Sequence, residues 1–192
     1  MGIAGLSEAK CGILAHMRRI AVIGSGGAGK SALARRLGEI LGIEVYHLDA
    51  IHWKPGWTPT PEDEWREINE KLAACDEWII DGNYGSTLDV RLAAADTVVF
   101  LDYPRSVCLW RAFKRRLQYH GKTRPDMGSG CREQIDWGFL KWIWRYPKDS
   151  RPSVIAKIEA FAQHATVIHL RSPREAEVFL GNSQLVTRKK PR

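Results

Sequence analysis

A glycine-rich segment near the start of the chain limits the possible folds more than any other feature. Residues 24–31 read GSGGAGKS and match the spacing G-x-x-x-x-G-K-[S/T] at every position. The run 18–23 (RRIAVI) precedes it and is typical of a buried parallel strand. Apolar residues at helical spacing follow it and end at Gly42, a common helix stop. Strand, glycine loop and helix form the context in which this spacing makes a phosphate-binding loop, or P-loop.

A P-loop binds phosphate mainly through its backbone. Glycines let the chain curl so that its N–H groups point at phosphate oxygens, and the helix N-terminus adds positive potential. We therefore predict ATP binding by Gly24, Ser25, Gly26, Gly27, Ala28, Gly29, Lys30, Ser31 and Ala32. Lys30 is expected to reach the β- and γ-phosphates, and the Ser31 hydroxyl to hold Mg²⁺. The flanking elements disfavour the alternative, a glycine-rich turn with a chance lysine.

The rest of the chain alternates between strand and helix patterns. Further strands are predicted at 43–49, 78–82, 97–102 and 166–170. Helices are predicted at 60–75, 104–119, 134–145, 152–164 and 172–180. With the first strand, this order predicts a three-layer α/β fold of the P-loop NTPase type, a five-stranded parallel sheet with helices on both faces. Ligands of such sheets bind at the carboxyl ends of the strands, where Asp49, Asp81 and Asp102 fall.

The chain of 192 residues is expected to form one domain. We place that kinase-like domain at 17–181, because Met17 stands directly before the first strand. Residues 1–16 are then an extension outside the core, and 182–192 a basic polar tail. Polar residues punctuated by glycine predict a short lid at about 120–132.

The composition is that of an ordinary globular protein. Hydrophobic residues make up 44% and charged residues 27% of the chain, which excludes wholesale disorder. No stretch approaches 18 consecutive apolar residues, so we expect no membrane span. The four cysteines lie far apart without a C-x-x-C spacing, which argues against a zinc site and a disulfide framework. A cytoplasmic location is therefore expected.

Positive charge gathers in two places, within a formal net charge of +7. Between Asp102 and Asp126 no acidic residue occurs, and the basic residues there are Arg105, Arg111, Lys114, Arg115, Arg116, Lys122 and Arg124. A second cluster, residues 188–192, ends the chain. A basic segment inside a domain indicates a polyanionic ligand, either a nucleotide phosphate or a nucleic acid. The alternative is a solvated surface, which we favour for the terminal cluster.

Several segments resemble small P-loop kinases. Residues 102–104 (DYP), followed by Arg111, Arg115 and Arg116, resemble the lid-entry helix of adenylate-kinase-like enzymes. The segment 121–126 (GKTRPD) resembles the short lid of shikimate and gluconate kinases. The resemblance implies that Arg111 flanks ATP. It also implies that Arg115, and Arg124 from the lid, close over the transferring phosphate.

A second resemblance covers nearly the whole domain, from about residue 18 to 172. The segments 47–53 (HLDAIHW), 81–84 (DGNY) and 122–126 (KTRPD) resemble bacterial proteins named DNA topology modulation proteins. The name of that family implies a regulatory role, whereas its motifs imply a kinase. Motifs of guanine-specific GTPases and of protein kinases are absent from the sequence.

Two carboxylates are candidates for the chemistry. Asp49 follows the second strand, where shikimate-like kinases place an acid that binds an acceptor hydroxyl, and it is expected to draw off the proton as general base. Asp81 is predicted to act on Mg²⁺ through water, as in a Walker B motif. The alternative for Asp81 is a cap for the turn before Gly82.

Trp53 and Arg91 are the further candidates for acceptor binding, beside Asp49. The indoles of Trp53 and Trp57 are suited to stack on a flat ring, although plugging the core beneath the loop is an equal alternative. A surface ion pair is the alternative for Arg91. Three tryptophans at helical spacing are expected to serve packing: Trp137, Trp142 and Trp144.

Together these features predict an ATP-binding phosphotransferase. It would move the γ-phosphate of Mg-ATP to a small acceptor, which is a nucleotide, a nucleoside or a hydroxylated metabolite. The alternative is an ATP-dependent regulatory protein that binds DNA and modulates its topology without such an acceptor. A sequence pI of about 9.4 favours that alternative, but helix-turn-helix, zinc-finger and OB signatures are absent. A slow ATPase without an acceptor is a third possibility.

Overall fold

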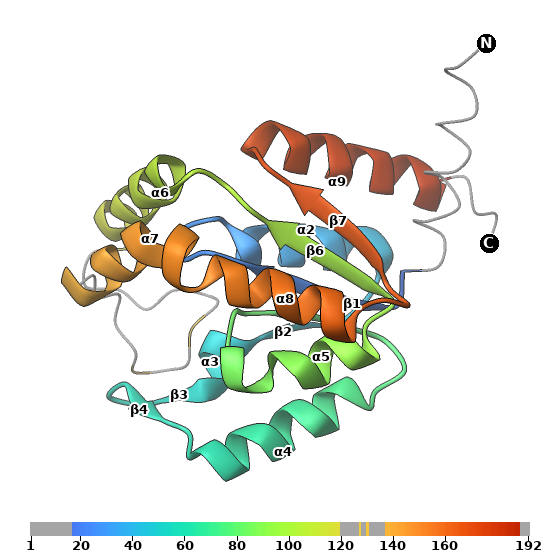
Figure 1. Ribbon diagram of the computed structural model, residues 1–192. Helices are drawn as coiled ribbons and strands as arrows, with labels where there is room; N and C mark the ends of the chain where they lie inside the picture. The colour runs from blue at the N-terminus through green and yellow to red at the C-terminus, as the bar shows by residue number, and fades with distance from the viewer. Residues whose placement is uncertain (1–16, 120–126, 128–129, 131–136, 189–192) are drawn as a thin grey trace.

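The computed structural model describes residues 17–119, 127, 130 and 137–188. In this part of the chain, five parallel strands form one sheet in the order β2-β5-β1-β6-β7 (Figure 1). The strands are β1 (Arg19–Gly24), β2 (Val45–His47), β5 (Trp78–Asp81), β6 (Thr97–Leu101) and β7 (Thr166–Leu170). Because β1 lies between β5 and β6, the glycine loop leaves the middle of the carboxyl edge of the sheet.

Helices cover both faces of this sheet (Figure 1). One face carries α2 (Lys30–Leu41) and α9 (Pro173–Arg188). The other carries α4 (Glu62–Ala73), α5 (Leu88–Ala94) and α8 (Arg151–Phe161). The remaining elements are α3 (Leu48–His52), the hairpin strands β3 (Trp53–Lys54) and β4 (Thr58–Pro59), the 3-10 helix η1 (Gly85–Thr87), α6 (Arg105–Gln118) and α7 (Trp137–Asp149). The predicted architecture, a parallel sheet between two helical layers, is confirmed.

The central strand shows why its sequence is apolar on both sides. Ile20 and Val22 belong to the core that includes residues of α2 and α9, whereas Ala21 and Ile23 belong to the core beneath α4, α5 and α8. All four side chains are fully buried. Successive side chains of a strand point to opposite faces, so a strand covered on both faces needs a continuous apolar run.

The second strand is shorter than predicted, and this changes the setting of Asp49. The strand ends at His47, and the chain turns at once into α3, which contains Asp49. Leu48 anchors this turn because its side chain is fully buried, close to Gly82 after β5. Asp49 therefore projects from a short helix beyond the sheet edge instead of lying on the strand.

The β3–β4 hairpin that follows α3 was not predicted from the sequence. Its turn contains Gly56 and Trp57 with φ angles of 77° and 62°. After the hairpin, the Oγ1 of Thr60 donates to the carbonyl of His52 at 2.9 Å. The backbone N–H of Thr60 donates to the same carbonyl, also at 2.9 Å. Thr60 thereby ties the end of the hairpin to the end of α3.

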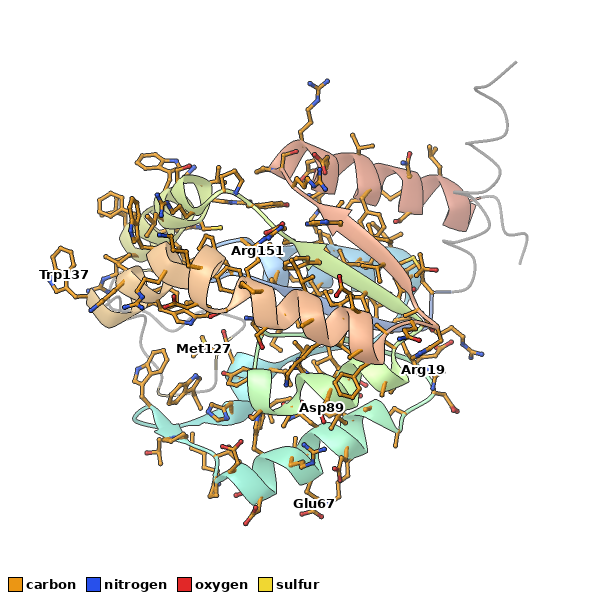
Figure 2. All side chains as sticks on the ribbon, in the orientation of Figure 1. Arg19, Glu67, Asp89, Met127, Trp137 and Arg151 are labelled. Atoms are coloured by element: carbon orange, nitrogen blue, oxygen red, sulfur yellow. The ribbon has the colours of Figure 1, made fainter. Side chains whose placement is uncertain are left out.

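Helices α7 and α9 differ from their predicted ends. Helix α9 continues to Arg188, well beyond residue 180, because its second half is still packed: Ser183 is fully buried and its Oγ donates to the carbonyl of Phe179 at 2.9 Å. Helix α7 continues through Pro147, at the loss of one backbone hydrogen bond. At its start, Trp137 is 86% exposed and points away from the molecule (Figure 2).

Some expectations fall on residues that are not described. The predicted extension 1–16 lies outside the described residues, as do Arg124 and all of the predicted lid except Met127 and Gly130. Cys75 and Cys108 are free cysteines. In the described ranges, no helix combines the length and apolarity needed to cross a membrane.

Candidate functional site

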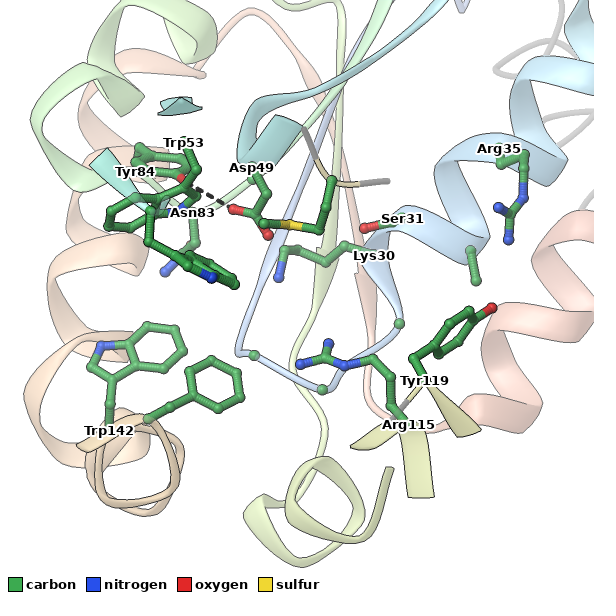
Figure 3. Close-up of a pocket in the computed structure, with 18 residues that line it drawn as sticks. Lys30, Ser31, Arg35, Asp49, Trp53, Asn83, Tyr84, Arg115, Tyr119 and Trp142 are labelled. Atoms are coloured by element: carbon green, nitrogen blue, oxygen red, sulfur yellow. Dashed lines mark hydrogen bonds between the residues drawn. The ribbon is translucent and has the colours of Figure 1, made fainter. Parts of the chain in front are cut away.

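A pocket of about 720 Å³ opens at the carboxyl edge of the sheet (Figure 3). Its floor comes from the glycine loop and the first turn of α2, and its sides come from α3, the β3–β4 hairpin, the residues after β5, and helices α6 and α7. Of the nine P-loop residues predicted to bind ATP, six line it: Gly26, Gly27, Gly29, Lys30, Ser31 and Ala32. Residues from distant parts of the sequence thus meet at the edge where ligands of parallel sheets bind.

The loop itself needs glycine for its shape and for close approach. Gly27 has a φ angle of 74°, in the left-handed region, and a side chain there would collide with the carbonyl of Cys108 on α6. Gly29, with φ of 92°, precedes the first residue of α2. The first turn of α2 carries no acidic side chain, so the positive end of its dipole is left for an anionic ligand.

Lys30 stands where the charges of the site converge. Its Nζ donates to the carbonyl of Ser25 at 3.1 Å. Burial lowers the pKa of Lys30 below its ordinary value, and the charge of Arg115 acts in the same direction, while Asp49 and Asp81 oppose both. Three further predicted site residues, Asp49, Asp81 and Arg115, therefore lie close enough to this ammonium group for their charges to act on it.

Asp49 is held by a tyrosine. The hydroxyl of Tyr84 donates to Oδ1 of Asp49 at 2.8 Å, and both residues line the pocket (Figure 3). Burial, and then the charge of Asp49, raise the pKa of Tyr84 far above its ordinary value. The phenol therefore stays protonated and keeps donating to the carboxylate. Tyr84 was not among the predicted site residues, although it belongs to the segment 81–84 that carried the family resemblance.

Five aromatic rings gather beside Asp49. Trp65 is fully buried, and the ring of His52 lies 4.6 Å from both Trp65 and Tyr84. Burial lowers the pKa of His52, which keeps this imidazole neutral. Trp53 and Trp57 instead line the pocket, with ring centroids 5.6 Å apart at 63°. The core beneath the hairpin is thus filled by Trp65, and the two hairpin indoles face the cavity.

Asp81 lies deeper than the other carboxylate. It is buried at the end of β5, and its Oδ2 is 3.0 Å from Nδ1 of His47. Among the described residues no group of three His, Cys, Asp or Glu side chains could hold a metal on its own. Mg²⁺ is usually held by one or two protein oxygens together with phosphates and water. The Ser31 hydroxyl lines the pocket and fits that donor set. Asp81 does not line the pocket, so it would reach such an ion only through water.

Arg91 does not reach the pocket. It is fully buried, and its terminal nitrogens donate to the carbonyls of Gly82 at 3.0 Å and of Tyr84 at 2.9 Å. Burial lowers the pKa of Arg91 to about 10. The expected roles, acceptor binding or a surface ion pair, do not match this position, because Arg91 is buried and its two terminal nitrogens hold the backbone after β5. Its sequence position after that strand gave no sign of such burial.

The arginines of α6 divide into two settings. Arg115 lines the pocket. Arg111 donates to the carbonyl of Ala28 at 3.1 Å and lies 6.0 Å from the ring centroid of Tyr103, so it supports the outer side of the glycine loop. Arg124, expected to close from the lid, lies outside the described residues.

Two aromatic residues of α7 were missed as pocket residues. Phe139 and Trp142 line the cavity, and a side chain on Gly26 would approach both rings to within 2.9 Å. Packing was expected for the tryptophans of this helix, but Trp137 and Trp144 are mostly exposed. The spacing of three between Phe139 and Trp142 places them on one helix face, which is the signal the sequence offered.

Comparisons with known proteins agree with this architecture. No protein-family model matches the chain, and no curated protein matches it. Among solved structures, it is similar to shikimate kinase from Acinetobacter baumannii in complex with shikimate, with a TM-score of 0.53 and 18% identity over 97% of this chain and 99% of that one. The chain has the three-layer α/β P-loop fold. Shikimate kinase from Bacteroides thetaiotaomicron is similar at a TM-score of 0.50 and 17% identity, over 90% of this chain and 99% of that one.

The three-layer α/β P-loop fold that was predicted from the sequence is confirmed. Both of these structural neighbours are small kinases of this fold. The resemblance to DNA topology modulation proteins is not confirmed by any comparison. The regulatory alternative also gains no support from the structural neighbours.

Proposed function

We propose that this protein transfers the γ-phosphate of Mg-ATP to a hydroxyl group of a small acceptor. The observation that carries the proposal is that Lys30 of the P-loop and Asp49, held by Tyr84, line one pocket and interact electrostatically. Phosphoryl transfer needs two substrates held in line and the charge on the moving group neutralised. Lys30 would neutralise charge on the phosphates, and the positioned carboxylate of Asp49 would align the acceptor hydroxyl with them.

The donor side of the reaction belongs to the P-loop and α6. Lys30 and the backbone N–H groups at the start of α2 would hold the β- and γ-phosphates, and Arg115 would neutralise charge on the group in transfer. Ser31 and, through water, Asp81 would hold Mg²⁺, which supplies further neutralisation of phosphate charge when bound.

The acceptor side belongs to Asp49. The acceptor hydroxyl gives its proton to the carboxylate as its oxygen bonds to the γ-phosphorus, while the bond from that phosphorus to the bridging oxygen breaks and ADP leaves. Tyr84 occupies one carboxylate oxygen and fixes the orientation of the group. An acceptor that is already a phosphate would not need a base, so the arrangement favours an alcohol.

The internal basic cluster does not require a nucleic acid. Arg111 is bound to the P-loop backbone, Arg115 lines the pocket, and the guanidinium of Arg105 lies 3.7 Å from the ring centroid of Trp144. These contacts support the kinase and do not favour the regulatory alternative.

The test measures ADP formation from Mg-ATP, alone and with pooled nucleosides, nucleoside monophosphates, polyols or sugar acids. We expect the pool of nucleosides, of polyols or of sugar acids to stimulate ADP formation, and stimulation by the monophosphate pool alone would contradict a hydroxyl acceptor. Lys30→Ala should lower the stimulated rate by at least about 100-fold, because it removes a cation from the transferring phosphates. The matched control is Lys71→Ala, an exposed lysine of α4 that pairs with Glu67. Stimulation that survives in Lys30→Ala, or is absent with every pool, would contradict the proposal.

A further inference from the structure

The part of the pocket around Asp49 has an unusual composition for a site that handles phosphorylated compounds. In addition to the Asp49 carboxylate, this part of the pocket is lined by the indoles of Trp53 and Trp57, the amide of Asn83 and the phenol of Tyr84. In the described part of the chain, the acceptor end defined by these five residues holds one negative group and no positive one.

The cations that line the pocket lie toward the donor side. They are Lys30 and Arg35 of α2 and Arg115 of α6. Figure 3 shows Arg35 and Arg115 on the opposite side of the cavity from Trp53 and Tyr84, with Lys30 between. Lys30 is already required by the phosphates of the donor.

Nearby cations of the neighbouring segments are directed elsewhere. Arg91, the first basic residue after the 82–84 segment, is buried, and its guanidinium donates hydrogen bonds to two backbone carbonyls. Lys54 of the hairpin does not line the pocket, and its Nζ lies 3.1 Å from Glu64 at the surface. An anionic group on the acceptor would therefore meet the charge of Asp49 without a described counter-charge at that end.

We infer that the acceptor is an uncharged molecule that carries a hydroxyl group and a flat ring face, as a nucleoside does, and that carboxylate- or phosphate-bearing acceptors are rejected. The inference rests on the proposed function, because it takes the hydroxyl to be the group bound by Asp49. The indoles offer faces on which a planar ring can stack, and the single carboxylate orients the hydroxyl. Like charges brought together in a partly buried site reject the wrong ligand, so Asp49 itself contributes to the selectivity.

The test compares matched pairs that differ only in an anionic group: adenosine with AMP, cytidine with CMP, thymidine with TMP, and gluconamide with gluconate. Binding to the full chain is measured by titration calorimetry without ATP, and transfer is measured separately with Mg-ATP. We expect at least one nucleoside to bind at least about tenfold more tightly than its monophosphate. Equal or tighter binding of the anionic member in every pair overturns the inference. Failure of every nucleoside to bind overturns it as well.

Two variants test the residues behind the selectivity. Trp53→Ala should weaken nucleoside binding by about tenfold, whereas Trp144→Ala, which removes a half-exposed indole outside the pocket, should not. Trp57→Arg adds a cation to the acceptor end and should shift the nucleoside-to-monophosphate preference by about tenfold toward the monophosphate. An unchanged preference in Trp57→Arg, with ATP binding retained, overturns the charge argument.

The two proposals fail in different ways. Transfer that depends on Lys30 and reaches a hydroxyl group, but only of acceptors that carry a carboxylate or phosphate, supports the proposed function and overturns this inference. Nucleoside binding that depends on Trp53, without transfer to any acceptor, supports the assigned ligand class and overturns the phosphotransferase.

Discussion

The orientation of the Asp49 side chain depends on residues that are distant in the sequence and meet it only in the folded chain. Arg91 holds the backbone carbonyls of Gly82 and Tyr84, and the hydroxyl of Tyr84 in turn holds Asp49. The fully buried arginine thus acts as a positioning residue, two contacts away from the carboxylate. Separate substitutions can test its effect on stability and the effect of the tyrosine on turnover.

Tyr84→Phe removes the hydroxyl from Asp49 and keeps the ring that packs 4.9 Å from Trp65. We expect kcat for transfer to fall by about tenfold or more, because a hydrogen bond to a charged group is lost, while KM for ATP stays unchanged. Steady-state kinetics with the preferred acceptor measures both constants. A parallel rise in KM for ATP, or an unchanged kcat, would show that Tyr84 does not act through Asp49.

Arg91→Met leaves two backbone carbonyls without their buried donor. We expect the free energy of unfolding to fall by about 2–4 kcal/mol, measured by urea denaturation. Arg66→Met, at a half-exposed arginine that pairs with Asp89, is the control and should change the midpoint little. Equal losses in the free energy of unfolding would mean that the buried hydrogen bonds of Arg91 stabilise the fold no more than an exposed ion pair does.

At the scale of the elements, the side chain of Asp102 connects β6, β7 and α8 near the carboxyl edge of the sheet. It follows β6, and its carboxylate accepts hydrogen bonds from Arg151 of α8 at 2.8 and 2.7 Å and from Nε2 of His169 on β7 at 2.8 Å. Burial alone raises the pKa of Asp102, but the hydrogen bonds from Arg151 and His169 outweigh it and hold the pKa below its ordinary value of 3.8. The ionised carboxylate therefore stabilises the fold.

This depressed pKa predicts how stability depends on pH. The contribution of Asp102 should be fully present above the unfolded pKa of about 3.8 and should be lost as pH falls through the lower folded pKa. Asp102→Asn should therefore be less stable than the parent at pH 7, and the difference should shrink below pH 4. Urea denaturation at a series of pH values measures it. A difference that is constant across this range would contradict the assigned linkage.

Some elements could be predicted from the sequence, and others could not. The strand, P-loop and helix around Lys30 follow from local signals, since glycine spacing and apolar periodicity are properties of neighbouring residues. The position of Arg91 does not, because its burial depends on carbonyls presented by a loop of the folded chain. Asp49 was expected at the end of the second strand, but it lies on α3, and the turn into this helix depends on Leu48 packing near Gly82.

At the scale of the whole molecule, the pocket draws on both layers of the fold. One core includes residues of α2, which begins within the P-loop, and the other includes Leu48 and Trp65 beneath the acceptor end. A ligand in the pocket would contact the first turn of α2 and the segments above Leu48 and Trp65, which belong to opposite faces of the sheet. Binding to the native state alone should therefore stabilise the entire domain.

Mg-ATP should raise the free energy of unfolding by about 2.7 kcal/mol at a concentration 100 times its Kd, since only the folded chain presents the P-loop. Thermal unfolding followed by circular dichroism at increasing Mg-ATP measures the gain. In Lys30→Ala the gain should be much smaller at the same concentration, whereas the surface variant Lys71→Ala should behave as the parent. A midpoint that does not move with Mg-ATP would argue against nucleotide binding in this pocket.

The most direct measurement follows the γ-phosphate itself. The full chain is incubated with γ-labelled Mg-ATP and the stimulating acceptor, and the label is separated into acceptor phosphate and inorganic phosphate, for the parent and for Asp49→Asn. We predict that the parent places the label on the acceptor, and that Asp49→Asn retains ATP binding but loses at least about 100-fold in transfer, because the base is gone. Label that appears only in inorganic phosphate, or transfer by Asp49→Asn at the parent rate, would contradict the account.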